Sequence, residues 1–269
     1  MKIPRSLLAV AICFAFTLTL HAQVFLPTGG YHRVACFKIK PGKADEFSKF
    51  AAGDLHKFAQ SRVDSGALTT WYLLRSVIPV GESAECDYLS VSMYAAAPTA
   101  PMTPDDTTNA LHKAGLNITA EDYNARRDAL TTLISNNLFQ NRASVGSAKK
   151  GDYFVVNYMH TNGTDDWVAF EKKMWQPIAE DMLKEGSRTG WSLNVAVLPF
   201  GSDLKYDGVT VDVYSSWDSI FSGDPHFADR FHKVHPDMEI GTTFEAYDKL
   251  RTLVQGELYH LDDAIIASK

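Results

Sequence analysis

The chain has 269 residues, of which 45% are hydrophobic and 22% charged, proportions that are typical of a globular protein. Its formal net charge of −6 argues against nucleic acid or an anionic membrane surface as a partner, because both attract basic proteins. The length suits one large domain or two small ones.

The first 22 residues differ in character from the rest. Lys2 and Arg5 form a short basic start, an apolar run extends from Leu7 to Leu20, and small Ala22 precedes Gln23. This is the pattern of a secretory signal peptide, because the run is short and poorly flanked for a membrane span; an uncleaved anchor is the alternative. The sequence therefore predicts a secreted or periplasmic protein with no membrane partner after cleavage.

An internal repeat organises the remainder of the chain. Residues of the stretch 71–94 reappear 120 positions later without a gap, and a period of this length indicates a duplicated domain rather than solenoid units. We expect the first repeat over 31–147 and the second over 151–266. The shared residues are Trp71/Trp191, Leu73/Leu193, Val77/Val197, Pro79/Pro199, Gly81/Gly201, Asp87/Asp207, Val91/Val211 and Tyr94/Tyr214.

Each repeat begins with a strand-like run, over 33–40 and 153–160. An amphipathic helix follows, and Gly66 or Gly186 marks its end. The stretch 71–94 then predicts two strands joined by a hairpin.

In this hairpin the repeated residues that begin with Trp71 and Leu73 occupy odd positions, and alternate residues of a strand share a face. The repeated face is predicted to pack beneath the helices, with Trp71 and Trp191 as packing anchors. We expect Leu89 and Val91 of the following strand to continue that face.

A second amphipathic helix is predicted over 120–138, with its counterpart over 242–253. A final strand is expected over 257–266, and a weaker equivalent near 141–145. The order strand, helix, strand, strand, helix, strand is the ferredoxin-like βαββαβ pattern of an α+β protein. Two such antiparallel sheets can face each other and bury the surfaces that their helices leave open.

The duplicated strand order and the paired patterns W-x-L-x3-V-x-P-x-G and D-x3-V-x2-Y resemble the dimeric α/β-barrel superfamily, specifically tandem members in which one chain supplies both halves. The resemblance covers residues 31–266 and implies an intramolecular α/β barrel. Its members include antibiotic-biosynthesis-type monooxygenases, haem-binding chlorite dismutases, dye-decolourising peroxidases, NIPSNAP-like proteins and stress-responsive barrel proteins. The fold alone does not choose among these functions.

The face on which the two copies differ is predicted to line the space between the sheets. An apolar cavity with a few polar and aromatic groups is typical of a small-ligand pocket. We therefore expect a small, largely apolar ligand, without a metal and without a resident cofactor; a wet, unspecific interface is the alternative. The predicted lining residues are Tyr72, Leu74, Ser92, Tyr158, His160, Asn194 and Asp212.

Other candidate chemistry has weaker support. His226, His232 and His235 gather within ten residues, but the first repeat does not share the cluster, so no metal site is predicted. A cofactor-independent monooxygenase or a purely structural module on the same scaffold stays open, as does the choice between monomer and homo-oligomer. Haem binding is a further alternative and needs an axial histidine. The formal candidates for that ligand are His112, His160, His232 and His260.

Cys36 and Cys86 are the cysteines that follow the predicted signal peptide. They could form a disulfide in an oxidising compartment. The second repeat has Val156 and Tyr206 at these places, so the shared scaffold does not need a bridge. Because cysteine behaves as a small hydrophobe, we predict two buried free thiols.

Overall fold

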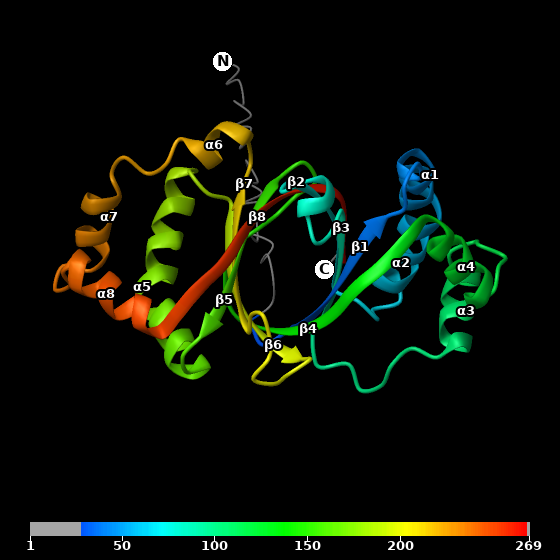
Figure 1. Ribbon diagram of the computed structural model, residues 1–269, viewed down its shortest axis with the longest axis horizontal. Helices are drawn as coiled ribbons and strands as arrows, with labels where there is room; N and C mark the ends of the chain where they lie inside the picture. Colours follow the sequence, from blue (N-terminus) through cyan, green and yellow to red (C-terminus); the bar gives the residue numbers. More distant parts are fainter. Residues whose placement is uncertain (1–27, 268–269) are drawn as a thin grey trace, which may run out of the picture.

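The computed structural model describes residues 28–267 (Figure 1). The predicted signal peptide over residues 1–22 lies outside these described residues. Within 28–267, every helix is too short or too polar to cross a membrane.

Each repeat follows the predicted order of strands and helices, with extra short helices between them. The first repeat consists of β1 (Tyr31–Ile39), α1 (Ala44–Phe50), the π-helix η1 (Ala51–Leu55), α2 (His56–Asp64), β2 (Thr70–Ile78), the 3-10 helix η2 (Gly81–Ser83), β3 (Tyr88–Tyr94), α3 (Pro104–Lys113), α4 (Ala120–Leu130) and β4 (Thr131–Gly146). The second consists of β5 (Tyr153–Thr161), α5 (Thr164–Glu185), β6 (Gly190–Leu198), β7 (Gly208–Tyr214), α6 (Trp217–Phe221), α7 (Phe227–Val234), α8 (Ile240–Leu250) and β8 (Arg251–Ile266).

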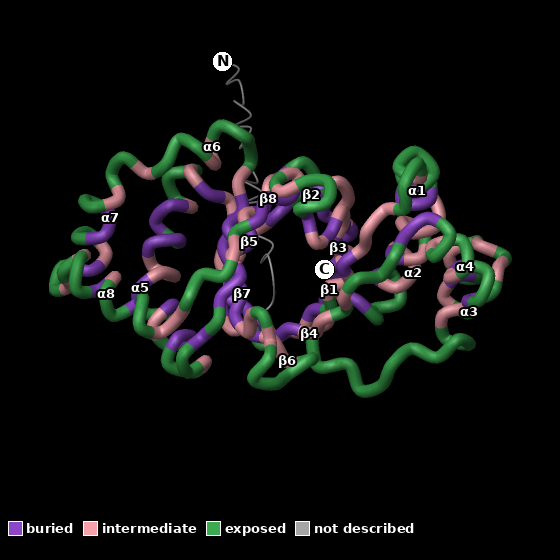
Figure 2. Tube along the Cα trace, in the orientation of Figure 1, coloured by how far each residue is buried: buried purple, intermediate pink, exposed green. Residues whose placement is uncertain are grey.

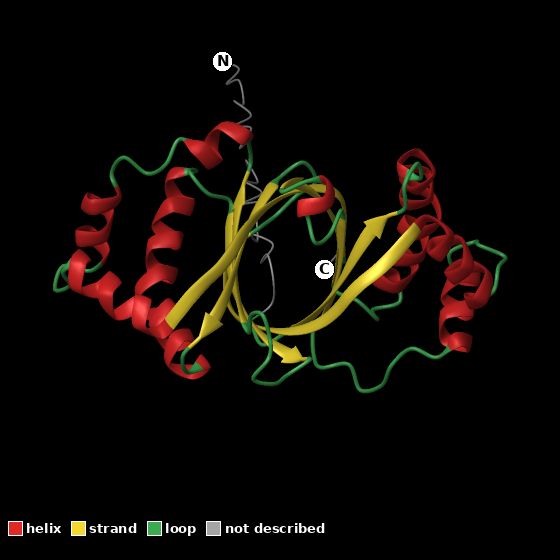
Figure 3. Ribbon diagram, viewed as in Figure 1, coloured by secondary structure: helices red, strands yellow, loops and turns green. Residues whose placement is uncertain are grey.

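The eight strands form one closed antiparallel barrel in the order β1-β3-β2-β8-β5-β7-β6-β4. The last strand of each repeat pairs both with its own repeat and with the other one, because β8 pairs with β5 and β2 while β4 pairs with β1 and β6. The helices of the two repeats cover opposite outer sides of the barrel (Figure 3). The predicted fold is therefore confirmed: two tandem ferredoxin-like sheets face each other across a shared interior.

The last strands are longer than the sequence predicts. β4 and β8 contain 16 residues each, and the helices before them end at Leu130 and Leu250. The predicted helix over 120–138 was therefore wrong beyond Leu130. The segment that starts at Thr131 is rich in β-branched residues, which favour strands, and its pairing with β1 outweighs the helical spacing of its leucines.

Buried apolar residues form three clusters, one inside the barrel and one beneath the helices of each repeat. The tube in Figure 2 shows buried residues along the barrel strands and along the inner side of α5. Trp71 and Leu73 pack beneath the helices of the first repeat, and Trp191 and Leu193 do so in the second. This part of the face assignment is confirmed.

The third strand of each repeat has the opposite orientation to the predicted one. Leu89 and Val91 point into the barrel rather than toward the helices. Residues directly opposite each other in an antiparallel pair share a face, and the register places Trp71 opposite Ser92. The prediction was wrong because the length and geometry of the hairpin set the register between the two strands. The repeated residues do not specify that register.

Candidate functional site

A cavity of about 80 Å³ lies inside the barrel. Because roughly 10–15 Å³ of such space holds one water, it offers room for roughly five to eight waters, or a one-ring organic molecule. Most of the wall is apolar. The apolar lining residues are Val34, Leu74, Leu89, Val91, Met93, Phe139, Phe154, Val156, Val209 and Val211.

The cavity reaches the surface between the hairpins that join β2 to β3 and β6 to β7. Glu85 and Lys205 occupy equivalent positions in the two repeats and meet here, with Lys205 Nζ 3.1 Å from the Glu85 carboxylate. Asn137 Nδ2 donates to the hydroxyl of Tyr206 at 3.4 Å. A second hollow beside this mouth shares Glu85, Asn137 and Tyr206 with the cavity.

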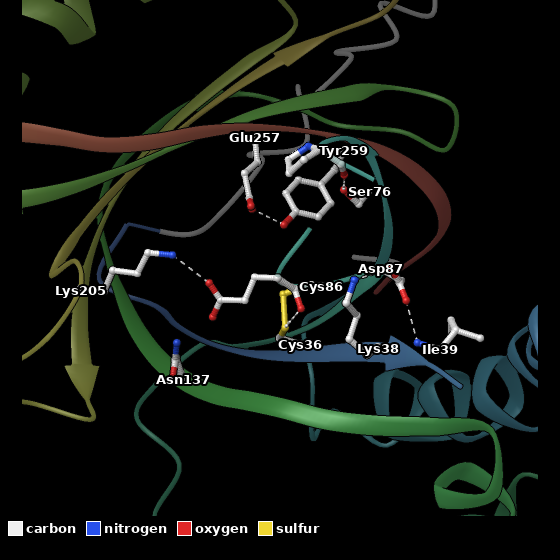
Figure 4. The surroundings of a disulfide bond; sticks show 12 residues. Cys36, Lys38, Ile39, Ser76, Cys86, Asp87, Asn137, Lys205, Glu257 and Tyr259 are labelled. Atoms are coloured by element: carbon white, nitrogen blue, oxygen red, sulfur yellow. Dashed lines mark hydrogen bonds and ion pairs between the residues drawn. A yellow bond between two sulfur atoms is a disulfide. The ribbon is translucent and has the colours of Figure 1, made fainter. Parts of the chain in front are cut away.

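Cys36 and Cys86 form a disulfide in the cavity wall (Figure 4). The prediction of two free thiols was therefore wrong. The fold brings β1 and the β2–β3 hairpin together, with 5.3 Å between the two Cα atoms, a separation that suits a disulfide. In the second repeat the Tyr206 ring packs on Tyr158 at a centroid distance of 4.5 Å instead. Comparing the sequences of the two repeats shows only that the second repeat has no such bridge. It does not show whether the first repeat forms one.

Three polar side chains are linked along the wall that the second repeat supplies. The hydroxyl of Tyr259 donates to the Glu257 carboxylate at 2.5 Å, and Gln255 Nε2 donates to the same group at 3.0 Å. Figure 4 shows the Tyr259 hydroxyl directed at Glu257. Burial, with the neighbouring Tyr259 and Glu257, holds the pKa of the Tyr158 hydroxyl well above its ordinary value. Both hydroxyls therefore stay protonated, Tyr158 as a donor to Tyr259 and Tyr259 as a donor to Glu257.

His32 adds a neutral polar group to the wall that β1 supplies. Its ring stacks on Phe139 with 5.4 Å between centroids. Burial lowers the pKa of the imidazole to about 4, so the ring is uncharged at neutral pH. Within residues 28–267 its Nδ1 has no hydrogen-bond partner. A ligand atom in the cavity could supply one.

Four of the seven predicted site residues line this cavity. They are Tyr72, Leu74, Tyr158 and Asn194. Asn194 is fully buried and receives a hydrogen bond from Asn141 Nδ2 at 3.0 Å. That any of the four contacts a ligand stays a prediction.

The other three lie elsewhere. Ser92 and Asp212 face the helices, because the sheet register pairs them with Trp71 and Trp191, which face outward. The pairing register of β5 shifts between Tyr158 and Met159, and this shift interrupts the alternation of faces along the strand. His160 follows the shift and is exposed. These three assignments to the cavity wall were wrong.

Several wall residues were not predicted at all. Glu257, Tyr259 and His32 line or border the cavity, and none of the three was assigned to a face from the sequence. The β8 alternation Glu257, Tyr259, Leu261 could have identified that face, since all three are buried and occupy every second position.

Asp212 instead belongs to a buried polar cluster beneath α5. Arg188 Nη1 lies 2.5 Å from its carboxylate, and Arg188 Nη2 donates to the Tyr214 hydroxyl at 3.1 Å. Nearby Glu171 is fully buried and accepts a hydrogen bond from the Tyr247 hydroxyl. Burial raises the pKa of Glu171 to about 7.

This raised pKa predicts a pH-dependent stability. Between about pH 5 and 7 the unfolded carboxyl is ionised while folded Glu171 keeps its proton, so the free energy of unfolding is expected to fall as pH rises, by up to about 1.4 kcal/mol per pH unit. Urea unfolding at several pH values measures this slope. Glu171→Gln is expected to flatten it, whereas Glu180→Gln, on the exposed side of the same helix, should keep it. Equal slopes in all three proteins would contradict the assignment.

The described residues and the barrel cavity can be compared with what a metal or haem requires. Over 28–267, no three His, Cys, Asp or Glu side chains gather closely enough to hold a metal ion. His32 is the histidine that lines the barrel cavity, whereas His112, His160, His232 and His260 do not. A space of about 80 Å³ is several times too small for a porphyrin, so haem does not fit the barrel interior.

Comparison with solved structures agrees with the fold. A proposed monooxygenase of Fusobacterium nucleatum matches with a TM-score of 0.54 and 11% identity, over 90% of this chain and 96% of that one. A proposed monooxygenase of Lactobacillus acidophilus matches with a TM-score of 0.50 and 10% identity, over 89% and 100% of the two chains. No protein-family model and no curated protein sequence matches the chain. The chain therefore has the tandem dimeric α/β-barrel fold, and at these identities the likeness extends to the fold alone.

Proposed function

We propose that this protein binds a small, largely apolar molecule inside its barrel. The observation that carries the proposal is the cavity itself, which combines apolar walls with a few convergent polar groups. Such a combination is the usual character of small-ligand sites. The polar groups include the Glu257 carboxylate as an acceptor and the unpartnered Nδ1 of His32. A ring-sized molecule with one hydroxyl matches both the size and the chemistry.

Titration with 4-bromophenol, a one-ring probe of this kind, tests the proposal. We expect saturable binding by isothermal titration calorimetry. Val91→Phe fills the cavity from β3 and is expected to weaken this binding at least tenfold, because the probe and the new ring would compete for one space. A second filling variant, Val209→Phe, does the same from β7 and guards against a local folding defect.

Val80→Phe is the matched control, since Val80 lies on a hairpin and is 62% exposed. It should change the affinity by less than twofold. Thermal unfolding of each variant verifies that it is folded. The proposal fails if the wild-type protein does not bind the probe, or if all three substitutions weaken binding equally.

We also propose that the mature protein is exported. The disulfide between Cys36 and Cys86 supports this, because disulfides persist mainly in oxidising compartments outside the cytosol. The expected result is a mature chain that begins at Gln23 and contains no free thiol, as measured by intact mass before and after alkylation. A chain that retains Met1 together with three alkylated cysteines, Cys13 included, would contradict the proposal.

A further inference from the structure

A second pocket, of about 140 Å³, lies outside the barrel between the first sheet and its helices. We call it the helix-side pocket. Its floor comes from β1, β2 and β3, and its roof from α1, η1, α2 and α4. Figure 1 shows these helices on the side of the barrel that β1 and β3 form. By the measure of roughly 10–15 Å³ per water, it holds roughly nine to fourteen waters, the size of a two-ring organic molecule.

Aromatic rings form much of its wall. Tyr123 on α4 contacts the rings of Phe50 and Phe58, with centroid distances of 5.4 and 5.2 Å. Trp71 supplies part of the floor. Aromatic rings prefer stacked or edge-on contacts with one another. A flat aromatic ligand therefore matches this wall better than a flexible chain.

The charged side chains that line the pocket are all arginines. Arg33, Arg62 and Arg127 contribute to the wall, and no acidic residue does so among the described residues. Arg33 Nε donates to the neutral Asn136 side chain, and Arg62 lies over the Phe58 ring at 5.8 Å. Arg127 pairs with Asp128, which is 61% exposed. The nearby Asp54 pairs with Arg126. The pocket thus keeps an uncompensated positive charge.

One buried donor at the pocket lacks a partner, and a buried hydroxyl lies on the same wall. Tyr123 is only 3% exposed and lines the pocket. Burial raises the pKa of that hydroxyl above its ordinary value, so it stays a donor. The buried Nε of Arg62 has no partner within residues 28–267. Leaving buried donors unpaired is costly, and a bound acceptor would remove that cost.

The second repeat fills the equivalent space with its own side chains. Trp175 and Met182 stand where the first repeat has Leu55 and Arg62. Met182 belongs to the buried cluster, and Trp175 packs against it. Arg188 and Asp212 form an ion pair there. The open space therefore belongs to the first repeat and does not follow from the scaffold alone.

We infer that the helix-side pocket binds a small aromatic carboxylate, with its rings among the aromatic side chains and its carboxylate held by Arg62 and the Tyr123 hydroxyl. Charge-assisted hydrogen bonds from arginine to carboxylate are among the stronger polar contacts in proteins. This site is separate from the barrel cavity and does not depend on the function proposed for it.

Calorimetric titration with 2-naphthoate and with its neutral analogue 2-naphthylmethanol tests the inference. The wild-type protein is expected to bind the naphthoate at least tenfold more tightly. Arg62→Gln should remove most of that preference, and Tyr123→Phe should reduce naphthoate affinity several-fold while sparing the alcohol. Arg142→Gln is the control, because it removes the same charge from β4, where Arg142 pairs with Asp165. Val91→Phe, which fills the barrel, should leave naphthoate binding unchanged.

The inference is overturned if both probes bind equally or if neither binds. It is likewise overturned if Arg62→Gln and Arg142→Gln have the same effect, because the preference would then reflect overall charge. Loss of naphthoate binding in Val91→Phe would place the probe in the barrel and also contradict a separate site.

Discussion

Replacing Arg188 with leucine is expected to lower the free energy of unfolding by about 3–5 kcal/mol, the usual cost of breaking a buried ion pair from one side. Arg188 and Asp212 are both buried, and 2.5 Å separates the guanidinium from the carboxylate. Without Arg188, Asp212 would keep only one long hydrogen bond, from Asn157 at 3.3 Å. The Tyr214 hydroxyl would lose its partner as well. Urea unfolding at pH 7 measures this loss.

The first repeat supplies the matched rescue. Leu68 and Ser92 stand at the places of Arg188 and Asp212, so the double variant Arg188→Leu/Asp212→Ser installs a pair that the same scaffold already uses. We expect it to recover at least half of the loss, because no buried charge is left without a partner. A single variant as stable as the wild type, or a double variant no more stable than the single one, would show that the pair is not the cause.

Removing the disulfide is the change with the second-largest expected effect. The double variant Cys36→Ala/Cys86→Ala should lose about 2–4 kcal/mol of unfolding free energy, because the bridge closes a loop over a sequence separation of 50 and thereby restricts the unfolded chain. The bridge also joins β1 to the hairpin at the cavity mouth, so we expect 4-bromophenol binding to weaken several-fold.

Two measurements separate the effects of the bridge. Wild-type protein treated with reductant should unfold at a lower urea concentration than untreated protein, whereas the double variant should not respond to reductant. Identical unfolding of reduced and oxidised wild-type protein would contradict a stabilising role.

The fold was predictable from sequence because its signals are local and occur twice. Trp71 and Trp191, with their alternate neighbours, identify a strand face by position alone, and both tryptophans are buried beneath helices. Which residues of a neighbouring strand share that face is harder to predict, because this depends on the register between the two strands. Ser92 and Asp212 were misplaced for this reason, since each lies opposite a tryptophan that faces outward.

The candidate site was less predictable because it is assembled from strands distant in sequence. Glu257 and Tyr259 come from the last strand, while His32 comes from the first described one. The alternation of Glu257, Tyr259 and Leu261 marks one face of β8, but it does not indicate that this face borders a cavity. The bridge between Cys36 and Cys86 depends likewise on a Cα separation that only the folded chain sets.

The position of bromine in crystals soaked with 4-bromophenol tests most directly whether the barrel is a binding site. We predict one anomalous peak inside the barrel, among Leu74, Val91 and Val209, with the phenol hydroxyl directed at Glu257. Crystals in which bromine is found only outside the barrel, or in which side chains close the cavity, would contradict the proposed function.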